Sequence, residues 1–599
     1  MAGEAVRRIQ LPPHSEYRIE LDAGESIALR FCPNPISGHY GDAEVFGAPL
    51  IAGAQERWYT FGNEAKFAIS SWGGADIEIA GTASTEYMAD EPSHTYTYRA
   101  NLHLNLERAR IRAREQLRTD SQLQKQLHDM DVSTRTTPPS YEESAAVPGH
   151  EWYQAAGQGP RVMVVGPESA GKTSLVTFLA NYALRSPILA SVEEGAEAAR
   201  RLSENQQNEG DESDDEATRA EGSKHEKISE VTGWWPMIVS LDPAEGAVPV
   251  PGCISAIPLM PTPTNCLPSP SPALPYGVTP QTTGSLPPSV STVHSVMPLT
   301  LWMGKQNVRD NERHSRRVID WLAFHVEKRM IKDLRARMSG LLIDMPGTIT
   351  ADGRTRYDFI RYCARAFKVD TIVVVGHEKL NLELSRIYAS DTSGQAPQIV
   401  KIPRSGGAVD VDEVYKQKLV DLQIRSYFYG MSSPSKETAA ADDEASGTQP
   451  AFQAVMSEPL GGVPTLNPYS STIPLDLLQV FRIGQDRVAP SSALPIGAER
   501  ALSELQVVKL DPTNNSSDLS SLLHSVLALI EPPPRKEPVS DDEPDAMYDD
   551  DELLGSTLTG FVHVSELDSN RKKLTVLSPK PGKLPSITAL IGNLHWQDT

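Results

Sequence analysis

The chain has only 4 cysteines in 599 residues, and no two of them form a CxxC pair. Cys32, Cys253, Cys266 and Cys363 are too few and too widely spaced to indicate a disulfide framework or a cysteine-based zinc site. Long apolar runs are also missing, since no stretch approaches the roughly 18 apolar residues of a membrane-spanning helix. Residues 1–8 lack the apolar run of a secretory signal. These absences predict a soluble intracellular protein that has no contact with a membrane.

Positive charge is scarce as well. There are 56 Lys and Arg against 78 Asp and Glu, which gives a net charge of −22. Proteins that bind nucleic acid directly usually show a basic excess. However, residues 193–230 and 541–552 carry −8 each, so the rest of the chain carries only −6. We interpret both runs as solvated segments that do not fold, with partner-binding tails as the alternative. The charge therefore does not exclude a role in RNA processing.

Two further stretches have compositions that disfavour folding. Residues 261–295 are rich in Pro, Ser and Thr, and residues 432–450 are small and polar. Such segments bury too little apolar surface to form a core. Together with residues 193–230, we expect them to be disordered inserts.

The first hundred residues alternate polar and apolar side chains in short runs broken by turn residues, which predicts an all-β domain. The runs are Tyr17–Leu21, Ser26–Phe31, Glu44–Phe46, Arg57–Phe61, Ala65–Ser70, Asp76–Ile79 and His94–Tyr98. Residues 102–118 then read as a helix that carries five arginines: Arg108, Arg110, Arg112, Arg114 and Arg118. This helix is either a solvated linker or a strip that faces RNA.

From Arg161 onward the chain indicates an α/β domain. Four apolar runs have the length of buried parallel strands; they are Arg161–Val165, Met237–Leu241, Leu341–Ile343 and Thr371–Val375. The segments between them can form helices at Thr173–Leu184, Val318–Met338 and Arg356–Phe367. The last part of the chain is again β-like, with strands expected at Gly560–Val564 and Lys573–Leu577.

We therefore expect a multidomain protein in which a central α/β P-loop NTPase domain is flanked by an N-terminal β domain and a C-terminal β-rich domain, with disordered inserts. The expected boundaries are 1–103 for the N-terminal β domain, 104–158 for the linker helix and a polar tether, 159–431 for the P-loop domain, 432–455 for an insert, and 456–599 for the C-terminal domain with its acidic loop at 541–552.

The strongest local signal is residues 166–173, which read GPESAGKT and complete the motif GxxxxGK[ST]. A predicted strand precedes the motif and an apolar-striped helix follows it, as the motif requires. In such loops the backbone N–H groups face phosphates, the Lys reaches the β- and γ-phosphates, and the hydroxyl binds Mg²⁺. The residues expected to hold ATP here are Gly166, Ser169, Ala170, Gly171, Lys172, Thr173 and Ser174.

A second predicted strand ends in Asp344, which is the usual place for a carboxylate that acts on Mg²⁺. The alternative is that Asp344 caps the following turn. Residues 344–347 also fit the DxxG of GTPases, but no guanine-reading NKxD motif follows, which disfavours a GTPase. Thr173 and Asp344 are the candidate Mg²⁺ ligands.

Beyond these motifs, the chain resembles the Clp/polynucleotide 5′-hydroxyl kinase family, of the fungal type, to which the Clp subunit of the pre-mRNA cleavage and polyadenylation factor belongs. The matching blocks run in family order from end to end, outside the inserts; they are residues 43–47, 59–61, 159–167, 250–252, 403–407, 424–430 and 577–579. The resemblance implies that the N-terminal domain closes over the adenine. Glu16 and Lys66 match the two residues that do this, although on their own both would read as ordinary surface charges.

Three positions depart from the family's kinases. The first Asp of their D-x-D-x-G-Q stretch, the RNA 5′-hydroxyl base, falls on Ser240 here, and the Trp of T-x-G-W falls on Thr348. The segment that carries phosphoryl-binding arginines offers Val411 and Lys416. A serine hydroxyl cannot act as a general base near neutral pH. All three departures affect catalysis and none affects nucleotide binding.

The resemblance therefore implies an ATP-binding, non-catalytic subunit of a pre-mRNA cleavage factor of the cleavage factor IA type. Such a subunit is required for endonucleolytic cleavage during polyadenylation-dependent mRNA 3′-end formation and bridges other subunits. The implied partners are the scaffold subunit that reads the RNA polymerase II C-terminal domain, other cleavage and polyadenylation factor subunits, and pre-mRNA indirectly, in the nucleus. The alternative is an active ATP-dependent polyribonucleotide 5′-hydroxyl kinase in which Asp242 replaces the base. A P-loop ATPase switch is a third interpretation.

Overall fold

The structure is a computed structural model. It describes residues 6–22, 25–32, 42–50, 59–62, 65–90, 94–120, 123, 138, 156–186, 233–244, 250–259, 298–347, 357–389, 396–429, 468–483, 507–512, 516–534, 548–579 and 581–597. The three inserts predicted at 193–230, 261–295 and 432–450 lie outside these residues. None of the helices that the structure describes combines the length and the hydropathy that a membrane crossing requires.

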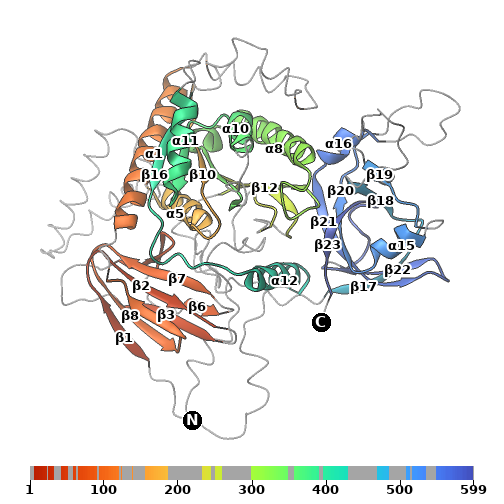
Figure 1. Cartoon of the computed structure of the whole chain (residues 1–599), viewed down its shortest axis with the longest axis horizontal. Helices are drawn as coiled ribbons and strands as arrows, with labels where there is room; N and C mark the ends of the chain where they lie inside the picture. The colour runs from red at the N-terminus through yellow and green to blue at the C-terminus, as the bar shows by residue number, and fades with distance from the viewer. Residues whose placement is uncertain are drawn as a thin grey trace, which may run out of the picture.

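The N-terminal domain is a sandwich of two antiparallel sheets, as the alternating runs predict (Figure 1). One sheet has the order β1 (Arg7–Leu11), β8 (Ala75–Gly81), β3 (Ser26–Cys32), β6 (Tyr59–Gly62). The other has the order β5 (Ala48–Pro49), β4 (Glu44–Val45), β7 (Lys66–Ser71), β2 (Ser15–Glu20), β9 (Thr85–Met88). Tyr17 and Ile19 of β2 face the core between the sheets, so Glu16, Arg18 and Glu20 face outward.

Helix α1 (His94–Thr119) leaves the sandwich and packs on the central domain. The interpretation of His94–Tyr98 as a β run is therefore wrong. The Thr–Tyr alternation there looks strand-like locally, but Tyr96, Leu102 and Leu106 are buried together against the central domain at helical spacing. Tertiary packing overrides the local pattern.

The central domain is built on a sheet with the order β13-β12-β11-β14-β10-β15-β16. The predicted runs form β10 (Arg161–Val165), β11 (Met237–Ser240), β14 (Leu341–Asp344) and β15 (Thr371–Val375), and together with β16 (Gln398–Ile402) they are parallel. β12 (Cys253–Pro258) and β13 (Leu299–Trp302) add an antiparallel edge. The helices are α5 (Lys172–Arg185), α8 (Glu312–Lys332), α9 (Leu334–Ser339), α10 (Asp358–Ala366), α11 (Glu378–Ala389) and α12 (Glu413–Tyr429).

Alternate residues of the central strands face two separate cores. Val162 and Val164 pack with α5 and α1, whereas Met163 and Val165 pack with the cluster that holds α8 and α10. Burial on both faces is what makes these strands continuous apolar runs. The predicted long helix at Val318–Met338 is interrupted at Asp333, whose side chain accepts hydrogen bonds from the first N–H groups of α9.

The C-terminal domain is one sheet of seven strands with the order β17-β22-β21-β20-β23-β18-β19. Its elements are β17 (Tyr469–Pro474), β18 (Gln479–Ile483), β19 (Val507–Lys509), α15 (Ser516–Leu522), β20 (Ser525–Ile530), α16 (Asp550–Leu554), β21 (Leu558–Asp568), β22 (Lys573–Ser578) and β23 (Thr588–His595). The strands predicted at Gly560–Val564 and Lys573–Leu577 lie in β21 and β22. The predicted fold class, with a P-loop domain flanked by two β domains, is confirmed.

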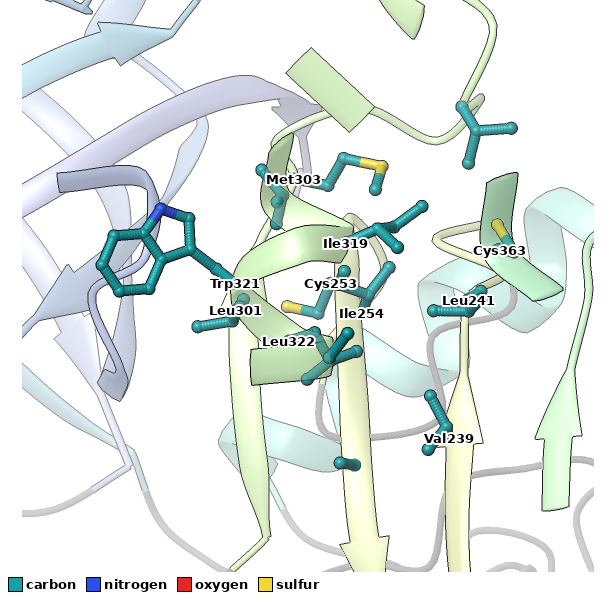
Figure 2. Close-up of a cluster of buried hydrophobic side chains, with 14 of the residues drawn as sticks. Val239, Leu241, Cys253, Ile254, Leu301, Met303, Ile319, Trp321, Leu322 and Cys363 are labelled. Carbon is teal, nitrogen blue, oxygen red and sulfur yellow. The ribbon is translucent and has the colours of Figure 1, made fainter. Parts of the chain in front are cut away.

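The interpretation of residues 541–552 as unfolded is wrong at its C-terminal end. Asp550–Leu554 form the short helix α16, capped by the Asp549 side chain. Arg317 of α8 makes a two-pronged ion pair with Asp551, and Leu553 and Leu554 are buried in the core that also holds Trp321 of α8. Figure 2 shows Trp321 reaching from α8 toward the C-terminal domain. This end of the acidic run folds because Asp551 has a basic partner in Arg317, and because the two leucines that follow are buried.

Candidate functional site

The P-loop lies between β10 and α5 and has the backbone that phosphate binding needs. Ser169 and Gly171 both have positive φ, at 54° and 84°. A Cβ at Gly166 would come 2.8 Å from the carbonyl oxygen of Val375, so only glycine fits there. A Cβ at Gly171 would meet nothing within 4 Å, which leaves open space beside the first N–H groups of α5. The loop is therefore an open cradle at a helix N-terminus, and it fits a polyphosphate.

Lys172 is positioned by the same loop. Its ammonium donates a hydrogen bond to the carbonyl oxygen of Pro167 at 2.8 Å, and the residue is only 8% exposed. Ala170, in the loop itself, is buried, and Thr173 and Ser174 are half-buried in the first turn of α5. The structure thus brings the predicted phosphate residues together in one loop and one helical turn.

Asp344 ends β14, the strand next to β10. In the sheet register Asp344 lies opposite Val164 on one side and Ser240 on the other. Asp344 and Ser240 are 5% and 4% exposed. Ligands in such sheets bind at the carboxyl ends of the strands, where the P-loop also begins. The described residues hold no cluster of three or more His, Cys, Asp or Glu side chains arranged for a metal ion.

The carboxyl edge of β11 carries no acid at the expected base position. Ser240 is the last residue of β11, and its backbone register pairs it with Ser255 and Asp344. Two residues later, the half-buried Asp242 accepts a hydrogen bond from the N–H of Ala244 at 3.0 Å, which stabilises a turn. Thr348 lies outside the described residues.

Glu16 and Lys66 lie on the outward face of the N-terminal sandwich. Register pairs Glu16 with Ser70 and Lys66 with Glu20, so the two predicted residues share a face without being directly opposite. Lys66 forms an ion pair with Glu20, with 3.1 Å between Nζ and Oε2. Arg18 forms one with Glu16, with 3.3 Å between its guanidinium nitrogen and Oε2. Burial of Arg18 opposes its charge, but Tyr87 and Glu16 hold its pKa above the ordinary value. The adenine role of Glu16 and Lys66 stays a prediction.

A segment of the central domain lies between that face and the P-loop. We call residues 403–412 the lid; they lead from β16 into α12. A Cβ at Gly407 would come 2.9 Å from Nε of Arg18, so the lid approaches the N-terminal domain closely. At its other end the N–H of Val411 donates to Oγ of Ser169 at 3.1 Å. The lid thus contacts both sides of the candidate nucleotide site.

Lys416, in the first turn of α12, is paired with an acid of the P-loop. Its Nζ lies 2.7 Å from Oε2 of Glu168, and this hydrogen bond raises the pKa of Lys416. Sequence reasoning missed Arg18 and Glu168. The acidic Glu168 inside a phosphate-binding motif was the available signal for one of them, because a carboxylate there needs a cationic partner.

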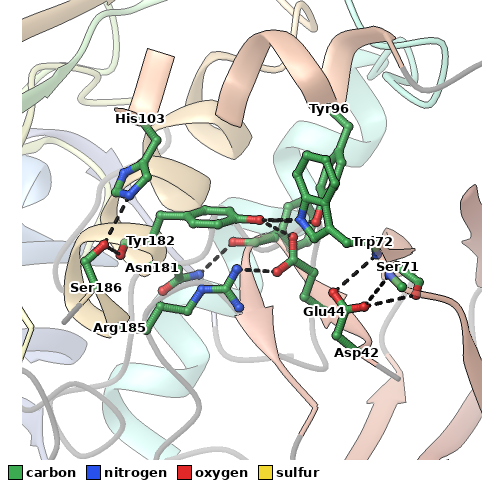
Figure 3. A network of polar contacts seen from close by, with 12 residues as sticks. Asp42, Glu44, Ser71, Trp72, Tyr96, His103, Asn181, Tyr182, Arg185 and Ser186 are labelled. Carbon is green, nitrogen blue, oxygen red and sulfur yellow. Dashed lines mark hydrogen bonds and ion pairs between the residues drawn. The ribbon is translucent and has the colours of Figure 1, made fainter. Parts of the chain in front are cut away.

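The N-terminal sandwich docks on α5 through a polar network centred on Tyr182 (Figure 3). The Tyr182 hydroxyl donates to Glu44 at 2.6 Å and accepts from the Trp72 indole at 3.1 Å, and Arg185 forms an ion pair with Glu44. Burial raises the pKa of Glu44, although Arg185 and Tyr182 oppose the rise. The tight turn after Glu44 brings the carbonyl of Phe46 to 2.8 Å from Nδ2 of Asn181. The helix that follows the P-loop is therefore also the docking site of the N-terminal domain.

The arginines of α1 divide into two sets. Arg110 and Arg114 are buried, and Nε of Arg110 donates to the carbonyl of Ser339 at 2.9 Å. Arg108, Arg112 and Arg118 are exposed. Two of the five arginines therefore hold the helix on the central domain, so on that face α1 is neither a solvated linker nor open to RNA, and both interpretations stay open only for the outer face.

Three family models match successive parts of the chain. They are the N-terminal beta-sandwich domain of polyadenylation factor (residues 10–113), the mRNA cleavage and polyadenylation factor CLP1 P-loop (231–430) and pre-mRNA cleavage complex II protein Clp1 (466–598). The second match begins after the GPESAGKT motif, but the strand that leads into this motif, β10, belongs to the same sheet as the matched strands β11, β14 and β15.

Relatives match over nearly the whole length. The mRNA cleavage and polyadenylation factor CLP1 of Malassezia globosa is 68% identical over 97% of this chain and 94% of its own, and that of Mycosarcoma maydis is 51% identical over 99% and 98%. A zebrafish protein (Danio rerio) called polyribonucleotide 5′-hydroxyl-kinase Clp1 is 24% identical over 100% of this chain and 95% of its own.

Two solved structures share the fold, each with a TM-score of 0.60 and 20% identity. One is a complex of wild-type Clp1p with Pcf11p and covers 100% of both chains; the other describes an extended Pcf11p–Clp1p interface and ATP loss in a point mutant, and covers 99% of both. With three successive family models and a relative this similar along its full length, the chain belongs to the CLP1 family of mRNA cleavage and polyadenylation factors.

Proposed function

We propose that this chain holds ATP with Mg²⁺ as a structural cofactor and does not transfer its phosphate. Gly166, Lys172 and the first turn of α5 would bind the phosphates, and Thr173 and Asp344 would serve the Mg²⁺. A P-loop Mg²⁺ uses one or two side chains plus phosphate oxygens, which matches this donor set. When bound, ATP supplies negative charge that links the P-loop, the lid and the N-terminal face.

One observation carries the non-catalytic part of the proposal: Ser240 stands at the end of β11 beside Asp344, where a general base is needed. A second supports it. Lys416, the cation in the segment where the family's kinases carry phosphoryl-binding arginines, is already paired with Glu168. Charge stabilisation of the transferring group is most of what a protein contributes to phosphoryl transfer, so a neutralised cation contributes little.

A transfer assay tests this. The purified full chain is incubated with γ-labelled ATP and a 5′-hydroxyl oligoribonucleotide, and we expect no labelled RNA above the level of Lys172→Ala. Labelled RNA from the wild-type chain would contradict the proposal.

The kinase alternative rests on Asp242 and on the name of the zebrafish relative. Asp242 is half-buried two residues past Ser240, and its carboxylate is held by the Ala244 N–H. If Asp242 is the base, transfer occurs in the wild type and disappears in Asp242→Ala, while Ser240→Ala keeps it. The same assay therefore separates the two functions.

The proposal extends to assembly. With ATP bound, the N-terminal sandwich, lid and P-loop domain would present one surface to a scaffold subunit of a cleavage factor of the IA type, similar to the Pcf11p found with Clp1p in the solved complexes. That scaffold would read the RNA polymerase II C-terminal domain, and pre-mRNA would be reached through it and other subunits, in the nucleus. We expect Lys172→Ala to weaken binding of the chain to this scaffold in a pull-down; equal binding would contradict the assembly role. Fluorescence microscopy of the tagged chain tests the location.

A further inference from the structure

Helix α12 is unusual in contacting all three domains. Its first turn lies at the nucleotide site: Lys416 pairs with Glu168 of the P-loop, and Nζ of Lys66, from the N-terminal sandwich, lies 5.8 Å from the centre of the Tyr415 ring. Figure 1 shows α12 between the N-terminal sandwich and the C-terminal sheet.

The other end of α12 is fixed to the C-terminal domain. The indole of Trp596 donates to Oδ1 of Asp421 at 2.6 Å, and its ring stacks on Phe428 with centroids 5.7 Å apart and planes 10° apart. The Tyr427 hydroxyl accepts a hydrogen bond from the N–H of Phe561 at 3.0 Å. These contacts define both the position and the rotation of the second half of the helix.

Burial changes sharply along the helix. Glu413, Val414, Gln417 and Lys418 are exposed, with Val414 at 66%, whereas Val420, Ile424 and Phe428 form a buried stripe at a spacing of four residues. A helix transmits position because its backbone hydrogen bonds make it stiff, and 17 residues span about 25 Å. The exposed first turn is therefore held by its own contacts and by the anchored second half.

We propose that α12 makes closure of the nucleotide site depend on the C-terminal domain, with Asp421 and Trp596 as positioning residues that place Lys416 on Glu168. The proposal rests on the proposed function, since it concerns the release of the bound ATP. A site that stays closed releases nucleotide slowly, and loosening the anchor raises the fraction of time the lid is open. Coupling of this kind is reciprocal, so bound ATP also stabilises the C-terminal anchor.

The test measures release of a fluorescent ATP analogue from the full chain during a chase with unlabelled ATP. Trp596→Phe keeps the stacking on Phe428 but removes the donor to Asp421. We expect release to be about three- to tenfold faster, the range that corresponds to the net loss of one ordinary protein hydrogen bond. Asp421→Ala should act in the same way.

Trp321→Phe is the matched control. Trp321 lies at the other contact between the central and C-terminal domains, on α8, where a Cβ added at Gly555 would come 2.2 Å from its ring. We expect its release rate to stay within twofold of the wild type. If both Trp variants release equally fast, general loosening explains the effect and the proposal is wrong; it is also wrong if Trp596→Phe releases at the wild-type rate.

The lid end has its own pair of variants. Lys416→Ala should release the analogue about two- to fivefold faster, as expected for a half-exposed ion pair. Lys401→Ala removes the Lys401–Glu378 pair, which has similar exposure but lies outside the lid, and should leave the rate unchanged. Because both anchors act through one helix, the double variant Trp596→Phe/Lys416→Ala should increase the release rate by less than the product of the two single increases. Fully multiplicative effects would contradict the coupling.

A wild-type chain that binds no ATP analogue would overturn the proposed function and this inference together. A wild type that binds it, with Trp596→Phe and Lys416→Ala indistinguishable from their controls, would overturn this inference alone.

Discussion

The two β domains are attached to the P-loop domain in opposite ways. The C-terminal sheet shares one continuous apolar core with it, in which Phe561 packs near Trp302 and Tyr427. The N-terminal sandwich has a separate core, and its strands meet α5 through the polar network of Glu44, Tyr182 and Arg185. Apolar burial is non-directional and strong, whereas a hydrogen-bonded junction can separate and re-form in water. The C-terminal attachment is suited to permanence and the N-terminal one to opening for a nucleotide.

The largest expected effect comes from breaking the shared core. Phe561 is 2% exposed, and Phe561→Ala should lower the free energy of unfolding by about 3–5 kcal/mol, because it leaves a cavity among aromatic neighbours. The central and C-terminal domains should lose stability together in a single denaturant transition. Two separated transitions, with only the C-terminal one shifted, would show that the core is not shared.

Breaking the polar junction should cost less and act locally. Glu44→Ala leaves Arg185 and the Tyr182 hydroxyl without the Glu44 carboxylate as acceptor, and we expect the free energy of unfolding to fall by about 2 kcal/mol. Hydrogen exchange should rise in β4 and in the second half of α5 while the C-terminal sheet stays protected. Glu78→Ala is the control, because it removes an ion pair with Arg30 that joins β8 to β3 of the sandwich and lies away from the contact with α5. Equal exchange changes in the C-terminal sheet would contradict the separation.

The smallest expected effect is a pH dependence of the same junction. His103 of α1 packs on Tyr182 with its ring centroid 5.1 Å away, and burial lowers the pKa of His103 to about 3. Below the ordinary His value of about 6.5, the unfolded chain binds a proton that the folded chain does not, so stability falls as the pH falls from 6.5 toward 3. Between pH 6.5 and pH 5, His103→Gln should lose about 1.7 kcal/mol less of its free energy of unfolding than the wild type does. Parallel denaturation curves for the two proteins would show that His103 does not titrate in this way.

Most of the fold could be predicted from local sequence patterns. β10, β11, β14 and β15 could be predicted because strands buried on both faces are apolar throughout. β12 could not, since its six residues include two small polar or sulfur side chains and a proline at the end, and its burial comes from β11 and β13. The helical state of His94–Tyr98 and of Asp550–Leu554 depends on partners far away in the sequence, such as Arg317.

The residues of the candidate site likewise fall into those that local sequence predicts and those that it does not. The P-loop is a contiguous motif, so its residues could be assigned from the sequence. The pairing of Lys416 with Glu168 joins residues 248 positions apart, and the approach of Arg18 to Gly407 joins two domains. Contacts of this kind follow from how the domains dock, which local sequence does not encode.

We propose that the chain retains ATP without using it. Native mass spectrometry of the purified full chain, after incubation with ATP, Mg²⁺ and a 5′-hydroxyl oligoribonucleotide, shows whether the bound nucleotide stays intact. We expect one bound ATP, intact after hours, and none on Lys172→Ala. Bound ADP that accumulates with phosphorylated RNA, or a wild-type chain that carries no nucleotide, would contradict it.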